Sequence, residues 1–200
     1  MSKSESRTEG KRNAGHHHVE AGRALVAIGV LVALWCAAFA AISVWFELTN
    51  YFAAGRYADD DTAISVVNWF VAVLKLAGVV LALLAVHPRL VAPRTVGTLL
   101  WAAFATVTVY VAGSITQAFV MLAGIAGNAD EVDAWSVTYV LAFMLAAAGF
   151  GVLATSHSRR AGLGTRIKVI GACGAPLVLG SVFVILPAIL RAVGMLSASS

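Results

Sequence analysis

The chain has 200 residues, of which 60% are hydrophobic and 12% are charged, with a formal net charge of +4 and a mean hydropathy of +0.87. A soluble domain carries about 25% charged residues, and a fold of this size cannot bury so much apolar surface. The composition therefore excludes a soluble globular domain and a disordered chain, and it predicts an all-α integral membrane protein. The basic residues fall between apolar stretches, so nucleic acid is not an expected partner.

Residues 1–22 are rich in Ser, Glu, Lys, Arg, Gly and His and show no apolar periodicity. Such a segment buries too little to offset the entropy of ordering, so we predict a flexible cytoplasmic tail. Its basic residues are expected to hold it loosely to anionic lipid. His16, His17 and His18 can bind a metal, but a flexible tail lacks the fixed geometry of a specific site. We therefore predict no metal site and no cofactor.

Five apolar segments follow, within one transmembrane domain at 23–196 and ahead of a short tail at 197–200. Each is long enough to cross a hydrocarbon core of about 30 Å at about 1.5 Å per residue. The segments are continuous, without apolar/polar alternation, which favours helices over barrel strands. The predicted transmembrane helices are 24–46, 63–86, 96–125, 134–155 and 169–190.

The connecting segments differ in charge on the two sides of these helices. Eleven basic residues precede the first helix or lie in the second-to-third and fourth-to-fifth connections, whereas the other side carries only Arg56 and Arg191 together with seven acidic residues. Positively charged short loops stay in the cytoplasm. The sequence therefore predicts a bundle of five transmembrane helices in the cell membrane, with the N-terminus cytoplasmic and the C-terminus outside.

Lys75 lies near the middle of the second predicted helix. A lysine at that depth costs about 2.5 to 3.5 kcal/mol on insertion scales, so it should face the bundle interior or a water cavity. We expect a polar cleft between the first three helices, in which Lys75 binds an anionic group or relays protons. The alternative is a structural lysine that snorkels or hydrogen-bonds to the third helix. The other residues expected in the cleft are Glu47, Asn68, Tyr110, Ser114 and Gln117.

Small residues recur at every fourth position of the first helix, at Gly29, Ala33, Ala37 and Ala41. This spacing lets another helix backbone approach closely. Packing within the bundle is the first interpretation. The second is that this helix docks a partner membrane protein.

Four short motifs resemble a known family: Ala40–Phe46, Val73–Gly78, Tyr110–Gly113 and Asp133–Trp135. On these, residues 24–155 resemble small actinobacterial membrane proteins of unknown function, domain-of-unknown-function family 3995. The resemblance implies a four-helix membrane core in which Lys75 is a recurring feature, and it carries no activity over. The fifth predicted helix lies beyond that four-helix unit.

Enzyme motifs such as a P-loop, HExxH or a GxSxG elbow are absent from the sequence, and no catalytic set can be assigned. The leading hypothesis is a non-enzymatic accessory, transport or small-molecule-binding module with its site around Lys75. One alternative is an intramembrane enzyme for a lipid-like or isoprenoid substrate, with Lys75, Glu47 and Tyr110 as acid/base or anion-binding groups. Another is a subunit of a multi-component transporter that docks through its first helix.

Overall fold

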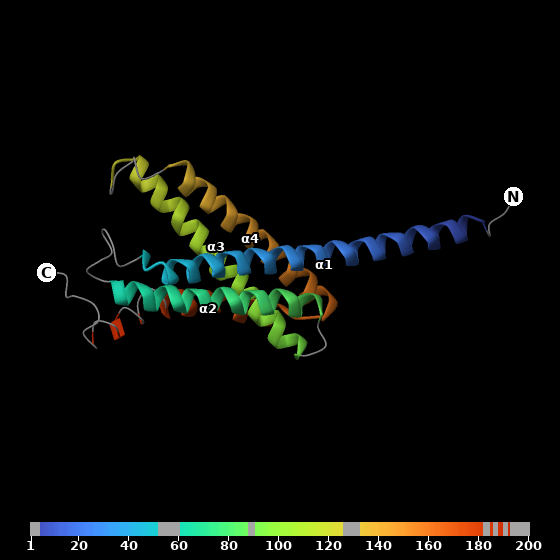
Figure 1. Ribbon diagram of the computed structural model, residues 1–200. Helices are drawn as coiled ribbons and strands as arrows, with labels where there is room; N and C mark the ends of the chain where they lie inside the picture. Colours follow the sequence, from blue (N-terminus) through green and yellow to red (C-terminus); the bar gives the residue numbers. More distant parts are fainter. Residues whose placement is uncertain are drawn as a thin grey trace.

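The computed structural model describes residues 5–51, 61–87, 91–125 and 133–181, with a few isolated positions beyond. This described part is helical and contains no strand. Four of its helices are long and apolar enough to cross a membrane, which confirms the predicted all-α membrane class at that level. They are α1 (Glu5–Leu48), α2 (Asp61–Val86), α3 (Pro93–Leu122) and α4 (Ala134–Arg160), shown in Figure 1.

The first helix begins at Glu5, well before the start expected from hydropathy. Residues 5–22, predicted as a flexible tail, continue α1 as helix and project away from the other helices in Figure 1. A helix propagates at little cost once nucleated, and Glu, Lys, Arg and Ala are good helix formers. The side chains of His16, His17 and His18 lie outside the described residues, as do residues 1–4 and 197–200.

The fifth predicted helix is interrupted. Where one helix over 169–190 was expected, the structure has α5 (Thr165–Ala172) and α6 (Gly174–Gly180), with little described beyond Ser181. Pro176 has no N–H to donate to the carbonyl of Ala172, and its ring disfavours the preceding turn. Neither short helix belongs to the four candidate spans, so a fifth span is not confirmed. Both pack against α3.

The four long helices form two pairs, with α1 packed along α2 and α3 along α4. We call the end where α2 and α4 finish and α3 starts the basic end, because Arg94, Arg159 and Arg160 lie there. The opposite end, which carries Glu47 and Asp133, is the acidic end. In Figure 1 the α3–α4 pair crosses the α1–α2 pair near the basic end and diverges from it toward the acidic end.

The principal core follows from this crossing, because all four helices meet only near the basic end. Its buried side chains are Val32, Ala33, Cys36, Ala82, Ala85, Val96, Leu100, Phe150, Leu153 and Ala154. The acidic half therefore holds fewer fully buried side chains. This division places the candidate sites in the half of the bundle where the helix pairs separate.

We call Gly29, Ala33, Ala37 and Ala41 of α1 the small-residue ladder. The first two of these residues are buried in the bundle. A Cβ added at Gly29 would lie 2.7 Å from Cγ1 of Val86, and Ala33 is buried, whereas Ala37 is half-buried and Ala41 is exposed. Close approach of α1 to α2 therefore requires a small residue at position 29. The first half of the ladder serves packing within the chain.

Candidate functional site

Lys75 lies between α1 and α2 and is held by neutral oxygen atoms. Its Nζ donates to Oγ of Ser43 at 2.8 Å and to the carbonyl of Phe39 at 3.2 Å, and it lies 5.8 Å from the centroid of the Phe39 ring. Among the described residues, no carboxylate makes an ion pair with it. The ammonium group therefore hydrogen-bonds to α1. The alternative in which it hydrogen-bonds to α3 is not what the structure shows.

Glu47 is bound one turn farther toward the acidic end. Its carboxylate accepts hydrogen bonds from Oγ of Ser65 and from Nδ2 of Asn68, the latter at 2.6 Å. The same Asn68 nitrogen donates to the carbonyl of Ser43 at 2.9 Å. Ser43 therefore joins both groups, with its carbonyl on Asn68 and its hydroxyl on Lys75. We call Ser43, Glu47, Ser65, Asn68 and Lys75 the polar seam.

Ser43 was not among the predicted site residues. In the structure its side chain is buried, with 3% of its surface exposed. It is four residues before Glu47, one helical turn away on the same face of α1. That spacing was the available signal, but an isolated serine in an apolar helix usually bonds to its own backbone. Only the placement of α2 shows that its hydroxyl contacts Lys75.

An aromatic cluster lies beside the polar seam, where α1, α3 and α4 meet. Phe39 stacks on Trp35 at 4.4 Å between ring centroids and meets Tyr139 at 5.5 Å and Phe143 at 5.3 Å. Tyr110 lies 5.0 Å from Phe143. Tyr110 therefore belongs to this cluster. The sequence predicts that Tyr110 shares a cleft with Lys75, but its neighbour in the structure is Phe143 on α4.

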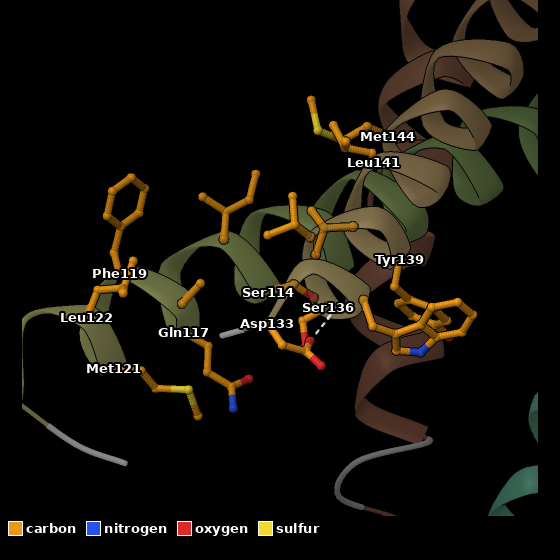
Figure 2. A pocket seen from close by; sticks show the side chains of 15 residues that line it. Ser114, Gln117, Phe119, Met121, Leu122, Asp133, Ser136, Tyr139, Leu141 and Met144 are labelled. Carbon is orange, nitrogen blue, oxygen red and sulfur yellow. Dashed lines mark hydrogen bonds between the residues drawn. The ribbon is translucent and has the colours of Figure 1, made fainter. Parts of the chain in front are cut away.

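A groove of ≈ 720 Å³ opens between the C-terminal half of α3 and the N-terminal half of α4. Figure 2 shows Ser114, Gln117, Asp133 and Ser136 near one another, with Leu141 and Met144 farther along α4. The volume lies within the usual range for small-molecule pockets, about 300 to 1,000 Å³. Its apolar walls are formed mainly by Ile115, Phe119, Leu122, Val137, Val140, Leu141 and Met144.

Asp133 stands at the start of α4 and faces this groove. Its Oδ1 accepts hydrogen bonds from the backbone N–H and the hydroxyl of Ser136, both at 2.7 Å. These bonds, the backbone one first, lower the pKa of Asp133 below its usual value of 3.8. The carboxylate is therefore ionised at neutral pH. An Asp directly before an apolar helical run is an N-cap signal that sequence reasoning did not use.

The basic end carries a second set of polar contacts between helices that the sequence did not single out. Nε2 of His157 lies 3.0 Å from the carbonyl of Pro93, and Nε1 of Trp101 donates to Oγ of Ser158 at 2.9 Å. Nη2 of Arg160 donates to the carbonyl of Ala85 at 3.0 Å. These contacts tie the ends of α2, α3 and α4 together, so they serve the architecture of the bundle.

The structure divides the predicted cleft into separate places. Glu47, Asn68 and Lys75 lie in the polar seam, whereas Ser114 and Gln117 line the groove, where Ser114 donates to the carbonyl of Tyr110 at 3.0 Å. Ser114 and Gln117 face α4 because α3 packs mainly on α4, α5 and α6. Within the described ranges, no group of three His, Cys, Asp or Glu side chains could hold a metal ion.

No protein-family model matches the chain, and comparisons with curated proteins and with solved structures also gave no match.

Proposed function

We propose that the protein is a non-enzymatic, multi-pass membrane protein that binds a small amphiphilic molecule in the groove between α3 and α4. One observation carries this proposal: a groove of ≈ 720 Å³ with apolar walls and a polar end lies within two helices that are apolar enough to cross a membrane. A pocket with a few polar groups in an apolar lining is the usual form of a small-molecule site.

The distribution of side chains along the groove suits an amphiphile. Leu141 and Met144 lie toward the middle of the bundle, whereas Gln117, Asp133 and Ser136 lie toward the helix ends (Figure 2). A tail against the apolar walls and a head at the polar end would match the polarity gradient of a bilayer around the same helices. The molecule can enter laterally because the groove is open between the two helices.

Binding is favoured over catalysis by the positions of the candidate acid/base groups. Lys75 and Glu47 are held in the polar seam by hydrogen bonds to α1 and α2 side chains and backbone. Tyr110 lies in the aromatic cluster. None of the three lines the groove, so a ligand there would not meet the set of groups that the enzyme alternative requires.

We further propose that the basic end faces the cytoplasm and that residues 169–190 make a fifth crossing. The support is the eleven-to-two division of basic residues between the two sides. A reporter that is active only outside the cytoplasm, fused after residue 200, should be active. An inactive reporter of normal abundance would favour four crossings with both termini on one side.

The binding proposal is tested by photolabelling of the full chain in phosphatidylcholine nanodiscs. The probe is an uncharged twelve-carbon alcohol with a diazirine in its chain, and labelled peptides are located by mass spectrometry. Labelling should concentrate at 114–122 and 133–144 and fall when excess unlabelled alcohol is added. Equal labelling of all four spans without competition would overturn the proposal.

A pair of matched variants makes this test specific. Ala118→Phe places a ring in the groove, because Ala118 lines it, and should remove competable labelling. Ala112→Phe makes the same change on an exposed position of α3 that does not line the groove, and it should leave labelling unchanged. If the two variants behave alike, the groove is not the binding site.

A further inference from the structure

We propose that the groove selects amphiphiles with a cationic ammonium head, because the carboxylate of Asp133 and the rings of Trp135 and Tyr139 line it together. This inference rests on the proposed function and names the ligand class of the same groove. The ligand is an alkyl or aryl ammonium ion without a phosphate group.

The described lining of the groove is negatively charged. Fifteen residues line the groove, and Asp133 is the only one of them that is charged at neutral pH. Its charged form is favoured by the hydrogen bonds from Ser136, which lower its pKa. None of the described residues that line the groove is a Lys or an Arg, so an anionic head would face a carboxylate without a compensating charge.

Two aromatic side chains of α4 line the groove together with Asp133. Trp135 and Tyr139 are one turn apart on α4, and Trp135 is 75% exposed. The face of an indole or phenol ring attracts an ammonium ion within about 6 Å of its centroid. A carboxylate next to such rings is therefore suited to an alkylammonium head, which offers charge and apolar surface together.

The lining also distinguishes a free ammonium amphiphile from a zwitterionic phospholipid. The phosphate of a phospholipid would find no cationic partner among the lining residues, and it would approach Asp133. The apolar walls offer room for one tail or a compact ring system in ≈ 720 Å³. A single-tailed amine fits both restrictions.

The experiment compares three photolabels of equal chain length in phosphatidylcholine nanodiscs: a trimethylammonium, an alcohol and a carboxylate. At equal membrane-bound concentration, the ammonium probe should label 133–144 about fivefold more strongly than the alcohol, the scale of one partly exposed charge contact. This preference should shrink as salt is raised. Competition with unlabelled dodecyltrimethylammonium should exceed that with added phosphatidylethanolamine.

Variants assign the preference to the groove. Asp133→Asn removes the charge while keeping a side-chain oxygen that caps α4, so the ammonium preference should fall to about onefold while the alcohol probe still labels. Glu47→Gln removes one charge from the same end of the bundle, in the polar seam rather than the groove, and should keep the preference. Trp135→Leu leaves the cap intact and should reduce the preference about twofold.

The outcomes separate this inference from the proposed function. If the alcohol and the ammonium label the groove equally, the cationic selectivity is overturned while the amphiphile site stands. If Glu47→Gln abolishes the preference as Asp133→Asn does, the general charge of the acidic end causes it and the inference is wrong. Stronger labelling by the carboxylate, or equal competition by phosphatidylethanolamine, overturns the assigned ligand class. If no probe gives competable labelling, the proposed function itself fails.

Discussion

Replacement of Ser43 by Ala should destabilise the bundle through Lys75. The change removes the hydroxyl that accepts from Nζ of Lys75 at 2.8 Å and leaves the carbonyl of Phe39, at 3.2 Å, as the remaining acceptor in the described structure. Interhelical hydrogen bonds in membrane proteins average about 0.6 kcal/mol and reach about 1.7 kcal/mol. Because the donor here is charged, we expect a loss near the upper part of this range, about 1 to 1.5 kcal/mol.

The size of the effect should depend on the lysine. Lys75→Met removes the ammonium together with its need for acceptors, so Ser43→Ala in that background should cost only about 0.3 kcal/mol. The coupling between the two positions is then about 1 kcal/mol, as expected for residues in direct contact. Asn68 still donates to the backbone carbonyl of residue 43 in every variant, so the remaining part of the polar seam is preserved.

The measurement is equilibrium unfolding in mixed micelles, followed by circular dichroism for the four variants of the cycle. Ser114→Ala is the matched control, because its hydroxyl bonds within the described part of the chain to the carbonyl of Tyr110 in its own helix. It should change the free energy of unfolding by less than about 0.5 kcal/mol. An equal cost of Ser43→Ala with and without Lys75 would refute the reasoning.

Two further predictions concern packing and pH. Gly171→Ala should lower the midpoint of thermal unfolding, since its Cβ would lie 2.5 Å from the carbonyl oxygen of Thr98, whereas Gly113→Ala, which meets nothing within 4 Å, should not. The pKa of Asp133 is lowered in the folded chain, so its contribution to stability is present above pH 3.8 and is lost as the pH falls through the lower folded-state value. Asp133→Asn should flatten this acid loss in melting curves taken between pH 2 and pH 6, roughly the range in which carboxylates titrate. A wild-type and a variant curve of the same shape would contradict that assignment.

The extents of the long helices were predictable because the bilayer acts as the solvent. The segments predicted at 63–86 and 134–155 correspond to α2 (Asp61–Val86) and α4 (Ala134–Arg160). Continuous apolar runs must satisfy their backbone groups internally, so they form helices whatever their neighbours are. Interruption of the last run was harder to foresee, since Pro is tolerated in many membrane helices.

The composition and the apolar runs by themselves predicted an all-α protein of the membrane class and its four long helices. Only the tertiary structure decided how each helix is rotated: Lys75 faces Ser43 on α1, whereas Ser114 and Gln117 face α4 across the groove. In water, an apolar stripe marks the buried face of a helix. In lipid, both the buried and the exposed faces are apolar, so hydropathy carries no information about rotation, and close packing and interhelical hydrogen bonds decide it.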